Sequence, residues 1–413
     1  MSEELKMGNA IQATRRPRQL IVFLILGALM TVSPFSIDMY LPAFAQMAQD
    51  FSTTPAKLAL TISSYFIGLA AGQIFYGPLL DRFGRKKPLY AGLIIYILSC
   101  FGCIESHSLE AMMIWRLVQS LGGGVAFVGT LAMVRDFFPV EESARILSLL
   151  MLILGISPLL APTVGGFIAA WLGWHWIFIL LAIIVFLILI LCFVFLPEVH
   201  KADITISLKP GAIIAVFIDI LKNRQFFTYA FAGAFSFATM FIYVAGSPMI
   251  FMNLFKVSPQ VYGGIFALLS VSFIGSNQLN VLLLRKYKST QIFKAALICQ
   301  SIASSLFLLG AMNHWFGLTG TITMFFICLG CLGLTYPNAS ATALAPFSKN
   351  AGSASALVGF LQIGVAALAS SAVGFFSSAD HVPIIAMLLG SSLIALLILL
   401  AGTRKIPISK IGD

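Results

Sequence analysis

Twelve apolar runs, each about long enough to cross a bilayer, limit what this chain can fold into. A membrane-spanning helix needs about 20 mostly apolar residues. The composition agrees, since only 10% of the 413 residues are charged, against roughly 25% in a soluble domain. The sequence therefore predicts an all-α integral membrane protein. We expect spans at 20–43, 57–79, 88–104, 109–134, 146–170, 174–196, 226–252, 259–284, 292–312, 315–345, 352–378 and 382–402.

The basic residues indicate how these spans are oriented. If both termini are cytoplasmic, 22 of the 25 Lys and Arg residues fall on the cytoplasmic side. Only Lys57 and Lys256 fall outside, and Arg116 lies within a span. Cytoplasmic loops carry such an excess of basic residues. We therefore expect cytoplasmic tails at 1–19 and 403–413. The charge of +10 is spread between the runs, which does not favour a nucleic-acid partner.

The chain divides into two similar halves. A polar linker at 197–225 separates a six-span bundle at 20–196 from another at 226–402. A shift of about 206 residues lays the span starts 20, 88, 109 and 146 onto 226, 294, 315 and 352. Repeated halves are typical of transporters, which bind substrate between the halves near the membrane midplane. Duplication without transport is the alternative. The long tenth run predicts a kink or interfacial turn near Pro337.

Asp38 and Arg116 are the two charges that lie clearly within the membrane part of the predicted spans. A carboxylate in hydrocarbon costs at least ~2.5–3.5 kcal/mol, so Asp38 must be protonated, paired or facing water. At 1.5 Å per residue, both side chains lie ~7–11 Å below the outer ends of their helices. We therefore expect them to share a water-accessible cavity, either as a functional pair or as a permanent ion pair that joins the first and fourth spans.

The loop between the second and third spans reads GPLLDRFGRKK. A loop that serves only to orient the chain would need its basic residues, but not an acid with two spaced glycines. The loop resembles the signature loop of the major facilitator superfamily. In that family the loop resembles a latch, here closing on the start of the eleventh span at 350–356 and favouring the outward-open state. The residues that would form it are Gly77, Asp81, Arg82, Gly84, Arg85 and Lys86.

Further segments resemble one branch of this superfamily. Arg116, Gln119 and Gly122 match a signature of the fourth span. The fifth span resembles the antiporter motif of drug exporters, on Gly155, Pro158, Pro162, Gly165 and Gly166. With the segments 36–43, 76–87, 133–139 and 161–178, the chain resembles the bicyclomycin-resistance (Bcr/CflA) branch of drug/proton antiporters.

This resemblance implies export of drug-like small molecules across the inner membrane by proton antiport through alternating access. It would need a proton gradient but no cofactor, and one chain would suffice. Asp38 would be the proton-coupling carboxylate with Arg116 as its partner, and one acid suggests one proton per cycle. The alternative is proton-coupled transport of a native metabolite, such as a siderophore, sugar or amino acid, on the same fold.

The cavity walls can be outlined from polar and aromatic residues in the spans, each of which could equally serve helix packing. The candidates are Tyr40, Tyr65, Gln73, Gln119, Met240, Phe241, Tyr243, Asn277, Asn338 and Gln362. No phosphate-binding loop, HExxH or GxSxG sequence is present, which disfavours an enzyme. The CxxC pairs lack further metal ligands and are expected to be packing residues. A membrane scaffold would not need Asp38.

Overall fold

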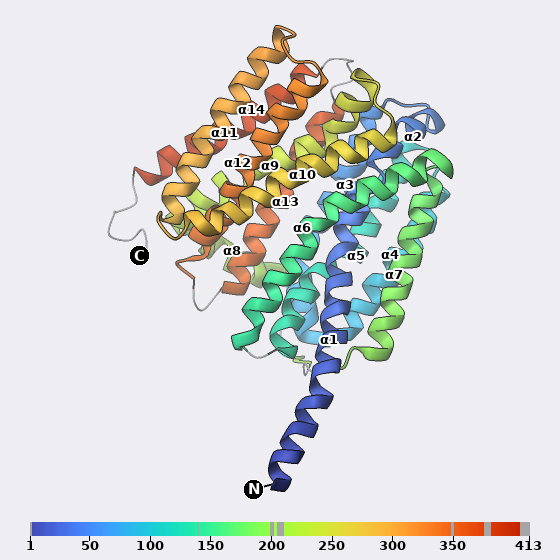
Figure 1. Ribbon diagram of the computed structural model, residues 1–413, viewed down its shortest axis with the longest axis vertical. Helices are drawn as coiled ribbons and strands as arrows, with labels where there is room; N and C mark the ends of the chain where they lie inside the picture. The colour runs from blue at the N-terminus through green and yellow to red at the C-terminus, as the bar shows by residue number, and fades with distance from the viewer. Residues whose placement is uncertain are drawn as a thin grey trace.

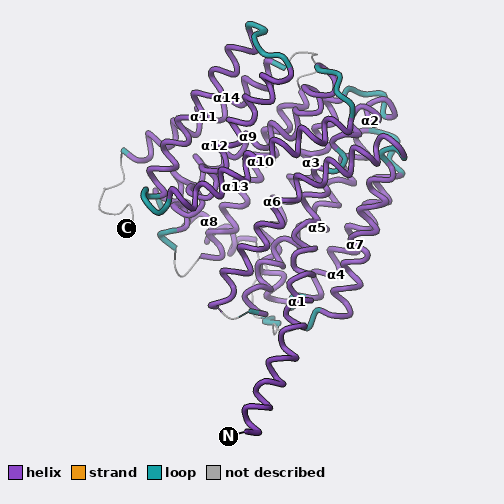
Figure 2. Tube along the Cα trace, viewed as in Figure 1, coloured by secondary structure: helices purple, strands orange, loops and turns teal. Residues whose placement is uncertain are grey.

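The computed structural model describes residues 2–138, 140–198, 202–204, 210–347, 351–375 and 381–404. Within these ranges, twelve helices are long and apolar enough to cross a membrane, which confirms the predicted span count. The first span is interrupted: α1 (Ser2–Asp38) is followed by the short 3-10 helix η1 (Leu41–Ala43) and by α2 (Phe44–Asp50). Figure 2 shows helices joined by short loops, and the described ranges contain no strand.

Each of the remaining spans is a single helix, except that the seventh continues into a short π-helix. In the first half they are α3 (Pro55–Phe83), α4 (Lys86–Ile104), α5 (Leu109–Phe137), α6 (Val140–Trp171) and α7 (His175–Phe195). In the second half they are α9 (Arg224–Pro248) with the π-helical η2 (Met249–Leu254), α10 (Pro259–Leu283), α11 (Ser289–Met312), α12 (Leu318–Leu344), α13 (Ala351–Phe375) and α14 (Val382–Thr403). Figure 1 shows the two halves as adjacent groups of helices.

The linker between the halves contains the amphipathic helix α8 (Pro210–Lys222). Its residues Phe217, Ile220 and Leu221 pack on the core of the second half, against α9 and α13. Because the number of spans is even, the first span starts and the last span ends on the same side as this linker. We call this side of the molecule the linker side and the opposite side the far side.

The predicted interfacial turn near Pro337 is wrong, whereas the alternative, a kink at this proline, stays a prediction. The helix α12 runs without interruption from Leu318 to Leu344 through this proline. Proline lacks a backbone N–H, but membrane helices tolerate it where side chains supply hydrogen bonds. The side-chain amide of Asn338 donates to the Leu334 carbonyl at 2.8 Å in the same turn, but the carbonyl that Pro337 leaves without a helical donor is that of Gly333.

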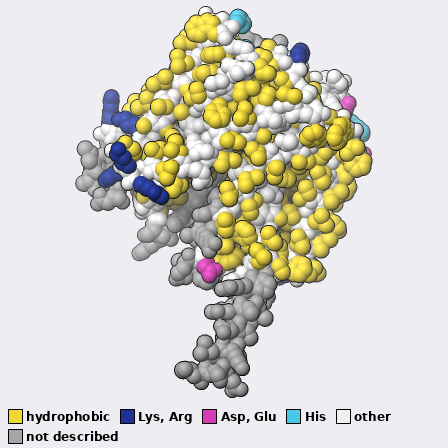
Figure 3. All heavy atoms as spheres, viewed as in Figure 1, with side chains coloured by type: hydrophobic (Ala, Val, Ile, Leu, Met, Phe, Trp, Pro, Cys, Tyr) yellow, Lys and Arg dark blue, Asp and Glu magenta, His cyan; other side chains and the backbone are white. Residues whose placement is uncertain are grey.

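Large apolar side chains cover the outer surface of the molecule, as Figure 3 shows for one face. Examples with more than half of their surface exposed are Leu98, Phe193, Leu306 and Leu397. Such a surface is unfavourable in water and is expected where lipid surrounds the helices. The buried charges among the described side chains are Asp38, Arg85 and Arg116.

Close contacts join the two halves on the far side. Between α3 and α13, Ser63 Oγ donates to Ser370 Oγ at 2.9 Å, and Ser370 Oγ donates to the Ala59 carbonyl at 3.3 Å. Between α6 and α10, a Cβ atom placed on Gly263 would lie only 2.9 Å from the Pro162 carbonyl oxygen. The two halves therefore touch backbone to backbone near their far-side ends.

Candidate functional site

The interruption of the first span follows from Pro42. A proline ring clashes with the carbonyl four residues earlier in a helix, which is here that of Asp38. The helix α1 accordingly ends at Asp38. The chain turns through Met39 and Tyr40, and Ala43 N donates to the Tyr40 carbonyl at 3.0 Å. The break leaves carbonyl groups at the end of α1 without intrahelical partners.

Arg116 of α5 satisfies one of these carbonyls. Its Nη2 donates to the Ser36 carbonyl at 2.7 Å, and its Nη1 donates to Gln119 Oε1 at 2.5 Å. A cation near a helix C-terminus is also favoured by the helix dipole. The side chain is fully buried, and its Nε has no hydrogen-bond partner among the described residues. Arg116 therefore acts as a side-chain cap that fixes the end of α1.

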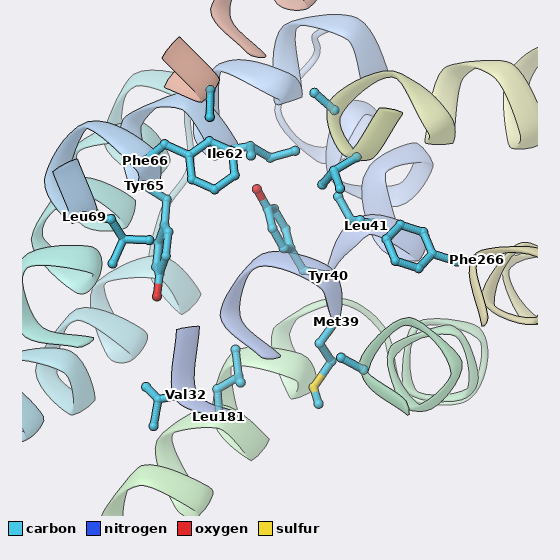
Figure 4. Close-up of a cluster of buried hydrophobic side chains, with 14 of the residues drawn as sticks. Val32, Met39, Tyr40, Leu41, Ile62, Tyr65, Phe66, Leu69, Leu181 and Phe266 are labelled. Atoms are coloured by element: carbon cyan, nitrogen blue, oxygen red, sulfur yellow. The ribbon is translucent and has the colours of Figure 1, made fainter. Parts of the chain in front are cut away.

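Two tyrosine rings hold the guanidinium. The Arg116 Cζ lies 4.4 Å from the ring centroids of both Tyr40 and Tyr65, and Phe178 is 5.9 Å away. Figure 4 shows the Tyr40 and Tyr65 rings on either side of a gap. Cation–π contacts become stronger when they are removed from water. The hydroxyls of Tyr40 and Thr61 lie 2.9 Å apart, which fixes the first ring.

The predicted pairing of Asp38 with Arg116 is wrong in this structure. In the part of the chain that the structure describes, no ion pair or hydrogen bond joins the two residues, and Arg116 is buried rather than in a water-accessible cavity. The physical reason is the direction in which the Asp38 side chain points from α1, not its depth in the membrane. Ser36, which Arg116 contacts, and Asp38 are two residues apart and so about 200° apart around α1. Asp38 therefore points away from Arg116.

Asp38 instead faces the other half of the molecule. It lies near Tyr243 of α9 and Tyr262 of α10. The hydroxyls of Tyr262 and Ser247 lie 2.8 Å apart. The buried Tyr243 hydroxyl has no partner among the described groups. The Asp38 side chain is 5% exposed, without an ion-pair partner in the described ranges. An isolated carboxylate thus lies where the two halves meet.

Two glycines of the fifth-span motif pack against backbone, one beside Asp38 and one at the start of α10. A Cβ atom on Gly165 would come within 1.7 Å of the carbonyl oxygen of Met39, the residue after Asp38. A Cβ atom on Gly166 would lie 2.6 Å from the Pro259 carbonyl oxygen of α10. Only glycine permits such close approach of two backbones. Gly155 is looser, with Ile274 of α10 at 3.6 Å, and α6 continues through Pro158 and Pro162.

The other candidate cavity residues fall into two groups. Tyr40, Tyr65 and Gln119 are buried around Arg116, as described above, and Gln119 also donates to Cys100 Sγ at 3.1 Å. The second group lies in or beside the second half, and the structure places its members separately. Phe241 packs on Phe66 with ring centroids 4.5 Å apart, joining the halves. Tyr243 faces Asp38, and Met240 is half-buried.

Four amides complete this set, and they do not converge on Asp38. Asn338 donates to Asn280 at 2.6 Å, and Gln362 donates to Ser340 at 3.3 Å, both within the second half. The half-buried Asn277 packs near Gly333. Gln73 of α3 lies beside Gly359 of α13, where the halves meet.

The signature loop forms a charge network on the linker side. Arg85 pairs with Asp81 of the same loop and with Asp136 of α5, the latter at 2.7 Å. Partial burial lowers the pKa of Arg85, but its hydrogen bonds to Asp136 and Asp81 outweigh this effect, so that the pKa is raised. Gly84 has φ +83°, a left-handed conformation that favours glycine where α3 ends.

The start of the linker is tied to this loop. Glu198 accepts hydrogen bonds from the backbone amides of Arg85 at 3.2 Å and Lys86 at 3.0 Å, at the N-terminus of α4. Asp203 N donates to the Asp81 carbonyl at 3.1 Å. The sequence alone predicted no role for Asp136 or Glu198. The available signal was that both residues are acids directly after apolar runs, on the same side as a basic loop.

The other loop residues have separate positions. Arg82 lies beside the Phe83 ring at 5.8 Å, and Lys86 beside the Tyr90 ring at 5.5 Å. A Cβ atom on Gly77 would meet nothing within 4 Å. The Asp81 carboxylate is directed to Arg85. Of the predicted latch partner at 350–356, residue 350 lies outside the described residues, and the others belong to α13, which begins at Ala351. The latch stays a prediction.

The twelve spans of the described ranges, with a buried carboxylate among them, are the architecture of a membrane transporter. Comparison with known families gives the particular class. The profile of the Major Facilitator Superfamily matches residues 26–370. The chain belongs to this superfamily, and it is a multi-pass protein of the inner membrane. In the described ranges, no group of three or more His, Cys, Asp or Glu side chains could hold a metal ion.

Relatives and solved structures agree with this family. The chain is 31% identical to a bicyclomycin resistance protein homolog of Haemophilus influenzae over 86% of this chain and 88% of that protein. It is 30% identical to the multidrug resistance protein MdtL of Shewanella oneidensis, over 82% and 85%. The fold resembles that of a D-xylose–proton symporter, with a TM-score of 0.73 and 15% sequence identity. The match covers 95% of this chain and 99% of the symporter chain. It also resembles that of a bacterial homolog of the human lysosomal transporter Spinster, with a TM-score of 0.75 and 13% sequence identity. That match covers 94% of this chain and 98% of the homolog's chain.

Proposed function

We propose that this protein exports drug-like small molecules from the cytoplasm by proton antiport through alternating access. One observation carries the proposal: Asp38 is a buried carboxylate at the break of α1, between the halves, with no cationic partner among the described side chains. A proton-coupled transporter needs a group of this kind, which can bind a proton on one side of the membrane and release it on the other. The names of the relatives, bicyclomycin resistance and multidrug resistance proteins, support drug-like substrates.

Asp38 is the proton-coupling residue in this proposal. A charged carboxylate in this place lacks a cation, so either a proton or a substrate that donates hydrogen bonds stabilises the site. Competition between the two couples substrate binding to proton release. With one carboxylate, one proton moves per cycle. At 100 mV that proton supplies ~2.3 kcal/mol, and each pH unit adds ~1.4 kcal/mol. A few kcal/mol sustain roughly hundredfold accumulation.

Arg116 is a positioning residue in this scheme. Its donors are bound to the Ser36 carbonyl and to Gln119 inside the first half. It therefore acts on proton transfer through the end of α1, which places Asp38, rather than through an ion pair. The aromatic walls beside Asp38, including Phe66 and Phe241, suit varied and partly apolar ligands.

The linker side is cytoplasmic in this proposal, with both tails inside. Contacts between the halves on the far side then exclude the outside solution from Asp38, and substrate enters from the cytoplasm. The loop at 77–87 acts as the latch when the linker side closes, with Asp81 exchanging Arg85 for the start of α13. A single chain contains both halves, so a monomer suffices.

Transport in liposomes tests the function. Purified protein in liposomes that are acidic inside is expected to accumulate a fluorescent exporter drug, because protons leave as drug enters. The accumulation should collapse with a proton ionophore and should be lost in Asp38→Asn. The matched control Asp219→Asn removes an exposed acid of α8 and should transport normally. Uptake of sugars, amino acids or siderophores only into liposomes that are acidic outside would instead support a proton-coupled importer.

A further inference from the structure

A hydroxyl group without a partner lies close to Asp38, at the place where the two halves meet. The Tyr243 side chain is 1% exposed, and its hydroxyl has no hydrogen-bond partner among the described groups. A buried hydroxyl without a partner is unfavourable and therefore uncommon. The sequence predicted Tyr243 as a wall of the substrate cavity, but a ligand cannot reach this hydroxyl in the present state. The hydroxyl therefore requires another explanation.

Two aromatic rings hold Tyr243 in place. Its ring centroid lies 5.2 Å from that of Phe266 of α10 and 5.2 Å from that of Phe325 of α12. Phe266 in turn packs beside Leu41 of η1, as Figure 4 shows. Because Leu41 follows Asp38 by three residues, this packing brings the Tyr243 ring close to the broken end of α1. The ring cannot turn its hydroxyl away without disturbing the close-packed core.

The second tyrosine near Asp38 has already used its hydroxyl proton. The hydroxyls of Tyr262 and Ser247 lie 2.8 Å apart, and Ser247 Oγ donates to the Val244 carbonyl at 3.3 Å. A hydroxyl group has one proton to donate. Since the Ser247 proton goes to the carbonyl, the Tyr262 proton goes to Ser247 Oγ. Of the two tyrosines, Tyr243 therefore keeps the free O–H donor.

The other polar groups around the end of α1 are also occupied. Arg116 donates to acceptors inside the first half, on another face of α1. The hydroxyl of Tyr40 donates to Thr61, because Thr61 itself donates to the Leu58 carbonyl at 2.6 Å. The nearest turn of α6 contributes glycine. Among the described residues, an ionised Asp38 thus has the tyrosine of α9 as its available donor.

We propose that Tyr243 donates a hydrogen bond to Asp38 when this carboxyl group loses its proton. The inference rests on the proposed function, in which Asp38 carries the proton. A hydrogen bond to the charged form of a carboxyl group favours loss of the proton, and such bonds are stronger than those between neutral groups. Tyr243 keeps its own proton throughout, so no further acid or base takes part.

This hydrogen bond makes the proton affinity of Asp38 depend on conformation. Asp38 belongs to the first half and Tyr243 to the second, and the halves touch on the far side in this structure. Closure of the far side brings the donor and the carboxylate together, which favours release of the proton toward the linker side. Opening of the far side separates them, so Asp38 regains a higher proton affinity. A proton antiporter requires this alternation, because it takes up a proton outside and releases it inside.

Infrared difference spectroscopy of the purified full-length protein, recorded as a function of pH, tests this role without drug or transport. The C=O band of protonated Asp38 is the band that Asp38→Asn lacks. In Tyr243→Phe, loss of the donor should raise the pH of half-protonation by about one to two units, a proton affinity about 10- to 100-fold higher. The matched control Tyr229→Phe makes the same change nearer the linker-side end of α9 and should keep the wild-type midpoint.

Two titration results would overturn the proposal. One is an unchanged midpoint in Tyr243→Phe. The other is a larger shift in Tyr262→Phe than in Tyr243→Phe, because the donor would then be Tyr262. If instead the midpoint shifts as expected but liposomes show no proton-driven drug transport, the proposed function fails while the hydrogen bond stands. If Asp38→Asn lacks no band, Asp38 does not titrate and both fail.

Thermal unfolding in detergent gives a second, independent measurement on the same variant. While Asp38 is protonated, the Tyr243 hydroxyl has no partner to lose, so Tyr243→Phe should unfold at or above the wild-type temperature at low pH. At high pH the wild type gains the hydrogen bond to the charged carboxylate, and the variant should unfold below the wild-type temperature. Equal destabilisation at every pH would mean that the hydroxyl serves packing alone, and would refute the proposal.

Discussion

At the scale of the residue, Arg116 shows how a membrane protein keeps a buried cation without a carboxylate. Its charge is met by a backbone carbonyl, an amide oxygen and two tyrosine faces. The hydrogen bonds of a planar guanidinium suit this arrangement, whereas an ammonium is a compact point charge. The cost of burying the charge is therefore offset inside the first half, and Asp38 remains available on the other face of α1.

Arg116→Lys tests this description. A lysine cannot reach Ser36 O and Gln119 Oε1 with the same geometry, and one charge-assisted hydrogen bond is worth about 1.5–3 kcal/mol. We expect a loss of stability of that size, measured by thermal unfolding in detergent, and weaker proton coupling because the end of α1 moves. The exposed Arg404→Lys is the control. Unchanged stability and coupling in Arg116→Lys would contradict its role as a cap.

The depth of Asp38 and Arg116 in the membrane could be predicted from the sequence, whereas the direction in which each side chain points could not. The common depth of Asp38 and Arg116 follows from counting residues along helices. The side of α1 on which each partner lies depends on the rotation of α1, and the tyrosines facing Asp38 come from the other half of the chain. Nothing local in the sequence specifies this contact between α1, α9 and α10.

At the scale of the element, the interrupted first span and the helix α6 form one unit. Pro42 ends α1 at Asp38, and Gly165 lets α6 approach the buried backbone of Met39. The antiporter motif was recognisable in the sequence because it requires glycine at this spacing. The segment that packs against these glycines could not be predicted, because the spacing of small residues identifies a face of the helix but not the surface that this face contacts.

Gly165→Ala tests this contact. The added Cβ would lie 1.7 Å from the Met39 carbonyl oxygen, so backbone must move, at a typical cost of 1–3 kcal/mol. We expect reduced stability and at least tenfold slower transport. Gly264→Ala is the matched control, because a Cβ there meets nothing within 4 Å. Equal behaviour of the two variants in thermal unfolding and liposome transport would refute the close approach of α6 and Met39.

At the scale of the whole molecule, the far side and the linker side differ in how the halves meet. Hydrogen bonds and backbone contacts join α3 to α13 and α6 to α10 on the far side. On the linker side, Asp81 is directed to Arg85, and Glu198 ties the linker to the loop. Repeated halves and their span count were evident from the sequence, but the closed side depends on contacts between distant segments.

Asp81→Asn tests the latch. We expect the variant to lose stabilisation of about 0.3–1 kcal/mol in the state closed on the linker side, the value for a carboxylate at a helix N-terminus. Distances between spin labels on the linker-side ends of the two halves should then shift toward longer values. Asp219→Asn is the control. An unchanged distance distribution in Asp81→Asn would exclude a latch at this residue.

The most direct test of the account is proton release on drug binding, measured with purified protein in weakly buffered detergent. Wild-type protein should release up to one proton per bound drug, because drug and proton compete at Asp38. Asp38→Asn should release none, whereas Asp219→Asn should match the wild type. Equal proton release from wild type and Asp38→Asn would contradict the account, since the coupling carboxylate would then lie elsewhere.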